Sequence, residues 1–367
     1  MNRSTLTRLV SGVVAFGCLL GVALTPRGAL AQGAEWDALV AAANKEGALV
    51  ISAPQGRDWR VQILEFQKAY PSIKMEVTPM ASRDFWPRFS KERDVGQILW
   101  DLRVGGMDAP GYAFKKAGAL EPVKPLLMLP EVTDSSKWLG GMDMSWLDKE
   151  KQFFFAFIAY ETASASYNKK FVATPEEQSV KGLLLPKFKG KISMADPRGG
   201  ASLNALSAIL QVYGEDFTRK LLGDQQPVIT KEPRQQMDWL AAGRYPIAFG
   251  IPKATFLEYG NRGVKLDDYV ELKELKVWTP GVGGITVMKG APHPNATKLF
   301  INWLLKRDTQ EKLTKELKLN SRRTDVESFD PELKLDPAYL ASYIGSQNEE
   351  IQDYQARVVS ILQELGK

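Results

Sequence analysis

Short apolar runs alternate with amphipathic stretches along the chain, and this alternation predicts strands followed by helices. Residues 35–46 place apolar side chains at helical spacing, and Gly47 ends that pattern. Residues 48–52 form an apolar run that predicts a buried strand, and a glycine-containing loop leads from it into a second helix. The next strand is predicted at residues 73–77. The order helix, strand, loop, helix, strand is typical of α/β proteins with a mostly parallel sheet.

The same unit recurs downstream. Residues 153–158 are aromatic and almost all apolar, as in a strand that is buried on both faces. Helices are predicted up to Gly214 and over residues 296–305, and residues 336–365 predict a helical tail. Further strands are predicted at residues 98–104, 191–195, 245–250 and 281–288. No low-complexity linker divides the chain, so we expect strands to cross between two α/β lobes and to act as hinges for closure on a ligand.

Residues 1–31 have the features of a cleavable export signal. Two arginines precede an apolar run over residues 9–24, and a small-x-small sequence at residues 29–31 precedes Gln32. The alternative, an uncleaved membrane anchor, needs about 20 apolar residues, and this run is shorter and contains three glycines. We therefore expect a mature chain of 367 − 31 = 336 residues that starts at Gln32 and works in the periplasm.

Composition excludes several classes of function. The only cysteine, Cys18, lies within the predicted signal, so the mature chain has no disulfide, thiol nucleophile or cysteine metal site. The net charge of +5 falls to +2 once the three arginines of the signal are removed. A protein that binds the phosphate backbone of nucleic acid would need a larger, clustered excess of positive charge. His293, the only histidine, lies between two prolines and cannot build a transition-metal site alone. We expect no resident metal and no cofactor.

A series of short motifs, in order along nearly the whole mature chain, resembles the extracellular solute-binding proteins that are similar to the periplasmic ferric-iron-binding family. The motifs are EWDALV at 35–40, NKEGALV at 44–50, YPSIK at 70–74, KAGALEP at 116–122, Tyr167-Asn168, FKGKI at 188–192, Asp196-Pro197 and GAPHPNA at 290–296. The resemblance implies a type II periplasmic-binding-protein fold, with crossings between lobes near Tyr160 and Trp278. It also implies a monomer that delivers a small solute to the inner-membrane permease of an ABC importer.

The lobe boundaries follow from those crossings. Residues 32–159 and 279–305 are assigned to lobe 1, and residues 160–278 to lobe 2. Residues 306–367 are expected to form a C-terminal helical segment that packs mainly on lobe 2.

Iron is disfavoured as the solute. In the iron-binding members of this family, two adjacent tyrosines follow the strand matched here by residues 245–250, because ferric ion prefers phenolate oxygens. This chain has Ile251-Pro252-Lys253-Ala254 instead, and Tyr259 has no tyrosine beside it. A cationic Lys253 at that place opposes a trivalent cation.

Four loops at the carboxyl ends of strands are the expected ligand-binding region, because ligands of open α/β sheets lie there. Arg57, Arg198 and Lys253 place a positive charge on three of these loops, and residues 198–202 open a helix whose N–H groups favour an anion. A small organic anion is the leading hypothesis. The alternative is that these cations are solvated surface charges, common in a chain with 48 Lys and Arg. The candidate ligand-binding residues are Gln55, Gly56, Arg57, Gly105, Gly106, Tyr160, Arg198, Gly199, Gly200, Ser202, Ile251 and Lys253.

Three details of this region stay open. Gly199 and Gly200 are also explained by a tight strand-to-helix turn. Tyr160-Glu161 is interpreted first as an interlobe hydrogen bond at the hinge, although Glu161 would accept an amine and so leaves a zwitterion open. Removal of the Arg198 side chain is expected to weaken binding more than tenfold.

Catalysis has little support in the residues. We find no nucleotide-binding glycine motif, no serine nucleophile motif and no HExxH sequence. We therefore expect a binding protein and not an enzyme. A sensor partner that docks on a receptor instead of a permease is a further alternative, as is an iron-binding member with an atypical site.

Overall fold

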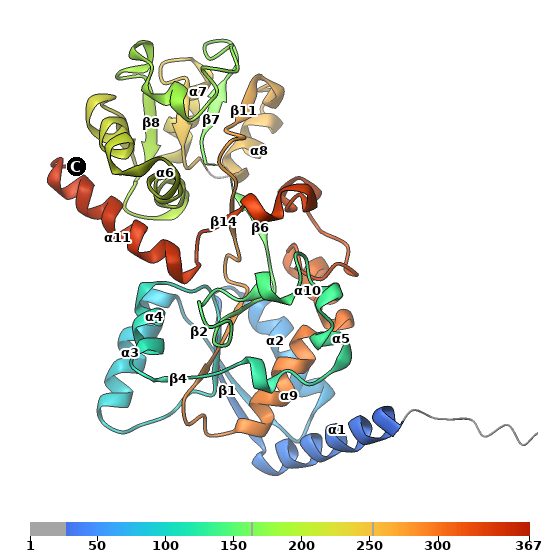
Figure 1. Ribbon diagram of the computed structural model, residues 1–367. Helices are drawn as coiled ribbons and strands as arrows, with labels where there is room; N and C mark the ends of the chain where they lie inside the picture. The colour runs from blue at the N-terminus through green and yellow to red at the C-terminus, as the bar shows by residue number, and fades with distance from the viewer. Residues whose placement is uncertain (1–26, 163, 252) are drawn as a thin grey trace, which may run out of the picture.

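Two mixed sheets, each covered by helices, lie one above the other and are joined by a narrow three-stranded ribbon (Figure 1). The computed structural model describes residues 27–367 apart from Ala163 and Pro252, and for residues 27–32, 253, 254 and 257 it describes the backbone alone. Most of the predicted export signal lies outside the described residues. Among the described residues, no helix is long and apolar enough to cross a membrane.

The first sheet has six strands in the order β2-β1-β3-β13-β4, with β5 paired to β13. β1 is parallel to β2 and β3, whereas β13 is antiparallel to β3, β4 and β5. The strands are β1 (Ala48–Ala53), β2 (Lys74–Pro79), β3 (Leu102–Val104), β4 (Leu120–Glu121), β5 (Phe155–Ala156) and β13 (Gly284–Met288). The helices of this lobe are α1 (Arg27–Glu46), α2 (Arg57–Ala69), α3 (Ser82–Asp94), α4 (Ala109–Lys116), α5 (Pro130–Thr133), α9 (Pro294–Leu305) and α10 (Arg307–Leu317).

The second sheet has five strands in the order β11-β7-β10-β8-β9. β8 is parallel to β9 and β10, and β7 is antiparallel to β10 and β11. The strands are β7 (Ser166–Asn168), β8 (Ile192–Ala195), β9 (Val228–Thr230), β10 (Ile247–Phe249) and β11 (Tyr269–Glu271). The helices around this sheet are α6 (Gly200–Arg219), α7 (Pro233–Ala241), α8 (Lys253–Asn261) and α11 (Glu349–Glu364). α6 kinks at Gly214, whose φ of 82° lies in the left-handed region that glycine adopts without strain.

The ribbon between the sheets contains β6 (Tyr160–Thr162), β12 (Val277–Thr279) and β14 (Ile344–Gly345). β12 lies in the middle, antiparallel to β6 and parallel to β14. The chain therefore passes between the sheets three times.

Several predicted elements differ from the structure. The sheets are mixed and not mostly parallel. The segment that returns from lobe 2 adds β13 to the sheet of lobe 1, and β13 runs antiparallel to its neighbour β3. Of the strand predicted at residues 98–104, only residues 102–104 form a β-strand, and of the one predicted at 153–158, only residues 155–156 do. The helical tail is interrupted by β14, whose backbone is held by β12. In the segment 306–367, α10 packs on α2 and α9 of lobe 1, whereas α11 packs on α6.

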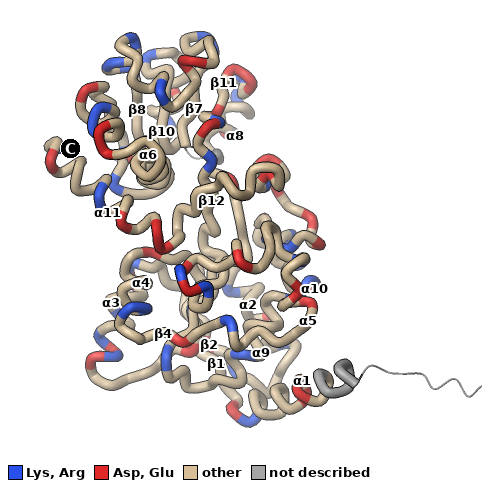
Figure 2. The backbone as a smooth tube through the Cα atoms, in the orientation of Figure 1, with Lys and Arg blue, Asp and Glu red and all other residues tan. Residues whose placement is uncertain are grey.

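Each lobe has its own apolar core. The core of lobe 1 surrounds Leu49, Phe66 and Phe300, and the core of lobe 2 surrounds Leu206 and Phe249. Figure 2 shows Lys and Arg interspersed with Asp and Glu along the described chain of both lobes. The search for a binding site therefore depends on individual charged residues and not on the overall distribution of charge.

Candidate functional site

Two pockets lie at the ends of the strands and along the ribbon between the lobes. The lobe 1 pocket has a volume of about 400 Å³ and the hinge pocket about 800 Å³. Val282 lines the first and Thr279, the last residue of β12, lines the second, so β12 and the crossover segment after it together border both pockets. The lobe 1 pocket is lined by Pro54, Gln55, Trp59, Met80, Ala81, Ser82, Arg103, Gly105, Gly106, Met107, Asp108, Val282 and Gln347. The hinge pocket is lined by Tyr160, Glu161, Thr162, Ser166, Ala201, Ile251, Phe256, Leu266, Tyr269, Val270, Glu271, Thr279, Lys318, Glu332 and Leu333.

Arg103 is the cation of the lobe 1 pocket. It lies on β3, in register with Ser52 of β1, and its guanidinium lies beside the rings of Phe85 and Trp86, 5.5 and 5.7 Å from their centroids. Its Nη1 donates a hydrogen bond to the carbonyl oxygen of Gly106 (2.7 Å). Only 3% of the residue is exposed, yet no described carboxylate forms an ion pair with it and its Nε has no acceptor among the described residues. Arg103 is thus a buried cation that has no ion-pair partner within the described part of the chain.

Gly105 makes room for this guanidinium. A Cβ atom at Gly105 would lie 2.3 Å from Nη1 of Arg103, so any other side chain would displace the arginine. Burial lowers the pKa of Arg103 to about 10, and the nearby Asp108 opposes that shift. The carboxylate of Asp108 itself accepts a hydrogen bond from the N–H of Gly111 (3.3 Å) and caps α4. Because a pKa of about 10 keeps Arg103 charged at neutral pH, a buried cation with one unpaired donor, Nε, lines this pocket.

The loop after β1 contributes to the same pocket. Gln55 lines it, and Gly56 precedes α2 with a φ of 115°, a backbone angle that favours glycine. Arg57 is the exposed first residue of α2 and is not among the residues that line the pocket. The structure thus brings Gln55 together with Gly105 and Gly106, as the sequence predicted, and leaves Arg57 outside.

The loop after β8 presents its arginine differently from the expectation. Arg198 donates from Nε and Nη2 to the two carboxylate oxygens of Asp196, each at 2.8 Å, and this pairing lowers the pKa of Asp196 to about 2. Gly199 and Gly200 begin α6, and Gly200 has a φ of 62°. Ser202 is buried and its hydroxyl donates to the carbonyl oxygen of Phe249 (3.2 Å), so it ties α6 to β10.

The hinge pocket contains two of the predicted residues, Tyr160 and Ile251. Burial raises the pKa of Tyr160 to about 12, which keeps its phenol protonated. Lys253 begins α8, but its side chain lies outside the described part of the chain. Glu161 accepts hydrogen bonds from Tyr343 and from Lys276 (3.3 Å), so this carboxylate joins segments of the hinge.

Several other polar side chains have partners within the fold. Arg323 donates to both oxygens of Asp325 at 2.9 and 3.0 Å, so this arginine and this carboxylate form a structural pair. His293 lies with Nδ1 2.8 Å from a carboxylate oxygen of Asp101, so it holds a turn. The phenol of Tyr259 donates to Asp238 (2.5 Å), and burial raises its pKa to about 12, which disfavours the phenolate that iron would need. Among the described residues, no group of three or more His, Cys, Asp and Glu could hold a metal ion.

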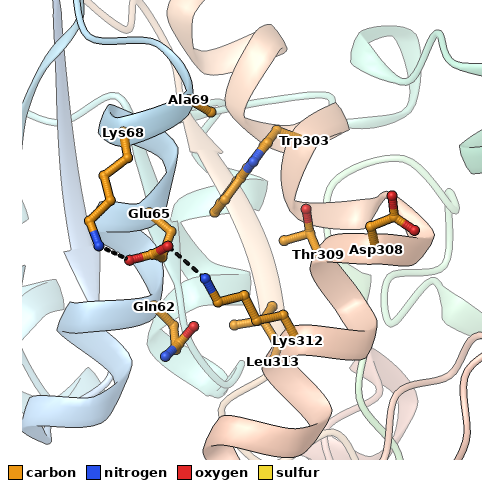
Figure 3. A pocket seen from close by; sticks show the side chains of 9 residues that line it. All are labelled: Gln62, Glu65, Lys68, Ala69, Trp303, Asp308, Thr309, Lys312 and Leu313. Carbon is orange, nitrogen blue, oxygen red and sulfur yellow. Dashed lines mark hydrogen bonds and ion pairs between the residues drawn. The ribbon is translucent and has the colours of Figure 1, made fainter.

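A third pocket, of about 380 Å³, lies on the outer side of lobe 1 between α2, α9 and α10 (Figure 3). One of its two carboxylates, Glu65, accepts hydrogen bonds from Lys312 (2.6 Å) and Lys68, and these lower the pKa of Glu65. Because its cations already have a partner, this outer pocket offers less to an anion than the lobe 1 pocket does.

Arg103 and Gln347 also line the lobe 1 pocket, and neither is among the residues predicted from the sequence. The signal for Arg103 is an arginine inside the apolar strand Leu102-Arg103-Val104, where a charge needs a reason to be buried. The sequence around Gln347 has no comparable signal, because Gln347 contacts the pocket through Met107, which lies 240 positions earlier in the chain.

Sequence comparison gives the family. Residues 62–341 match the family described as bacterial extracellular solute-binding protein. An uncharacterized protein of Haemophilus influenzae is 31% identical over 170 residues, which cover 42% of this chain and 47% of the relative. The chain therefore spans about half the length of that curated relative.

Solved structures share the fold at low sequence identity. Iron-bound HitA from Pseudomonas aeruginosa is 15% identical, with coverage of 87% of this chain and 99% of that chain and a TM-score of 0.58. The open ferric iron-binding protein A of Mannheimia haemolytica is 13% identical, with coverage of 87% and 98% and a TM-score of 0.62. AfuA from Actinobacillus pleuropneumoniae, with fructose-6-phosphate bound, is 21% identical, with coverage of 87% and 98% and a TM-score of 0.56. The fold is the two-lobe periplasmic-binding-protein fold, and by its sequence match the chain belongs to the bacterial extracellular solute-binding protein family.

Proposed function

We propose that this protein captures a small organic anion in the periplasm and delivers it to an ABC importer. The observation that supports an anionic solute is Arg103, a buried guanidinium whose Nε has no acceptor among the described residues and which lines the lobe 1 pocket. An unpaired buried charge is costly, and a bound carboxylate or phosphate would supply the missing partner. Among the solved structures of this fold, AfuA with fructose-6-phosphate shows one that holds an organic anion.

The arrangement supports binding in two stages. The anionic group first meets Arg103, next to Gln55, Ser82 and the glycine loop at 105–106, all on lobe 1. The second lobe then closes through the ribbon of β6, β12 and β14 and brings the N-terminus of α6 toward the solute, where free N–H groups favour negative charge. The remainder of the solute would lie in the hinge pocket beside Tyr160 and Ile251.

Three predicted residues of the second lobe stay in this proposal with altered roles. Gly199 and Gly200 form the turn that presents the end of α6, and Arg198 reaches the solute only if it leaves Asp196. We therefore assign the main electrostatic contact to lobe 1. The domain division at residues 159–160 and 278–279 is retained, because the ribbon strands β6 and β12 lie at those positions.

The test is a thermal-shift screen of residues 32–367, dialysed to remove any bound compound, followed by calorimetric titration of each compound that shifts the melting temperature. The panel contains fructose 6-phosphate, citrate, short carboxylates, inorganic phosphate, neutral sugars, amines and ferric ion. A compound at 100 times its Kd should stabilise the protein by about 2.7 kcal/mol.

We expect organic anions to raise the melting temperature and neutral sugars not to. A shift produced by ferric ion alone would overturn the proposal in favour of iron, which the ferric-iron-binding proteins of this fold carry by name. A shift produced only by uncharged compounds would remove Arg103 from its assigned role. Loss of uptake of the same anion in a strain that lacks this protein would distinguish import from sensing.

A further inference from the structure

The C-terminal segment makes a third connection between the lobes. β14 pairs with β12 in the ribbon, residues 346–348 form a turn, and α11 then runs along α6 of lobe 2. In Figure 1, α11 extends from the level of α4 in lobe 1 up to α6 in lobe 2. Most of this helix therefore packs on lobe 2, whereas its first turn contacts lobe 1.

Gln347 is the point at which this connection meets the lobe 1 pocket. Its Oε1 accepts a hydrogen bond from the N–H of Met107 (2.7 Å), in the loop that follows Gly105 and Gly106. Its Nε2 donates to the carbonyl oxygen of Gly281 (2.9 Å), in the crossover after β12. One amide therefore bonds both to the glycine loop and to the hinge crossover.

The contact is close enough to restrict the loop. A Cβ atom at Gly106 would lie 2.5 Å from the carbonyl oxygen of Gly281 and 3.1 Å from the Gln347 amide. The glycine loop is therefore packed directly against the crossover and against Gln347. A shift of the loop changes at least one of these contacts.

The first turn of α11 is also fastened to lobe 1. The main-chain oxygen of Gln347 accepts from the phenol of Tyr112 (2.7 Å), and the N–H of Glu349 donates to the carbonyl oxygen of Leu147 (2.8 Å). The carboxylate of Glu349 pairs with the buried Lys115 (2.6 Å). Together these contacts hold the start of the helix on lobe 1.

The other end of α11 is fastened to lobe 2. Arg357 donates from Nη2 and Nε to Glu215 of α6, at 2.6 and 2.9 Å. Gln355 donates to Asn204, also of α6 (3.3 Å). These two sets of contacts therefore connect the lobes through α11, and Gln347 belongs to the set on lobe 1.

We propose that Gln347 is a positioning residue of the binding site, which couples the glycine loop of the lobe 1 pocket to lobe 2 through α11. Its two hydrogen bonds set the angle between the lobes when no solute is bound. A solute that accepts hydrogen bonds from the N–H groups of the loop would disturb the bond between Met107 and the side-chain amide of Gln347, and would so favour closure of the lobes. The inference rests on the proposed function only in taking this pocket as the solute site.

The test measures the angle between the lobes without any solute. The mature chain is predicted to contain no cysteine, so Val95→Cys on lobe 1 and Val212→Cys on lobe 2, exposed by 71% and 56%, can carry a pair of spin labels. The interlobe distance distribution is measured in this background and with Gln347→Ala added. The matched control is Gln310→Ala, because Gln310 is a buried amide of α10 that also makes two hydrogen bonds, to Leu304 (2.8 Å) and Ser321 (2.7 Å).

We expect Gln347→Ala to shift or broaden the distance distribution and to speed amide hydrogen exchange in the peptide that contains Met107. Gln310→Ala should lower the melting temperature and leave both readouts unchanged. Gln347→Glu keeps an acceptor for Met107 but has no donor for Gly281, so it should restore slow exchange without restoring the distance. A Gln347→Ala distribution identical to that of the parent would overturn the inference. Because no solute is added, that result says nothing against anion binding, and failure of every anion in the thermal screen says nothing against the coupling.

Discussion

Replacement of Arg103 by methionine separates its role in binding from its role in the fold. Methionine retains much of the length and removes the charge. Burial lowers the pKa of Arg103 from 12.5 to about 10, and at about 1.4 kcal/mol for each pH unit this corresponds to about 3 kcal/mol of destabilisation of the charged form. Loss of the hydrogen bond to Gly106 and of the contact with two aromatic rings offsets about 2 kcal/mol of that. Solute-free Arg103→Met should therefore be about 1 kcal/mol more stable than the parent.

The effect on binding has the opposite sign. Two hydrogen bonds between a guanidinium and an anion contribute about 3 kcal/mol together, so the Kd should rise by about 100-fold. Stability is measured by urea unfolding without solute, and affinity by calorimetric titration with the organic anion that gives the largest thermal shift. Arg323→Met is the control, because Arg323 is equally buried but has Asp325 as its partner away from both cleft pockets.

The control should lose stability and keep its affinity. Arg103→Met that binds the anion as tightly as the parent would refute the assignment of the cation. Arg103→Met that unfolds several kcal/mol more easily, with an unchanged Kd, would show instead that the guanidinium serves the packing of lobe 1.

Three further predictions concern the surroundings of the site. Gly105→Ala should displace the guanidinium of the pocket and weaken anion binding at least tenfold by titration, whereas Gly199→Ala, with no atom within 4 Å of its added Cβ and an extended backbone, should bind normally. Arg198→Ala should raise the Kd less than threefold, since its partner carboxylate already occupies the guanidinium, and a loss above tenfold would restore this arginine to the site as first expected. Arginine partners lower the pKa of Glu215 and of Glu364 from 4.5 to about 2, so their contribution to stability is complete above pH 4.5 and is lost as the pH falls toward 2. Melting temperatures between pH 6 and 2 should show that fall, and replacement of either carboxylate by glutamine should flatten it.

Much of the fold could be predicted because its signals are local. The apolar run at residues 48–52 and the turn at Gly47 predicted the first strand, which the structure has at Ala48–Ala53. Gly214 was predicted to end a helix, and in the structure it marks a kink beyond which α6 continues to Arg219. The tail could not be predicted in the same way, because β14 exists only through its pairing with β12 and has no periodicity of its own.

The sequence predicted that the loops lining the lobe 1 pocket would meet, but not which partners their charged residues would have. Gln55, Gly105 and Gly106 follow strands, and strand ends converge by topology, so their meeting could be foreseen. Charge alone did not show that Arg198 would pair with Asp196 two positions earlier, or that Arg103 would be buried without a carboxylate. Both outcomes depend on side-chain direction, which a pattern of polar and apolar residues does not determine.

The most direct test of the account is a crystal structure of residues 32–367 with the organic anion that gives the largest thermal shift. We predict a closed cleft in which the carboxylate or phosphate of the anion lies within hydrogen-bond distance of the guanidinium of Arg103. The N-terminus of α6 should face the same carboxylate or phosphate. An anion held by Arg198 or Lys253 with Arg103 out of contact would contradict it, as would a ferric ion in the cleft as the only bound species.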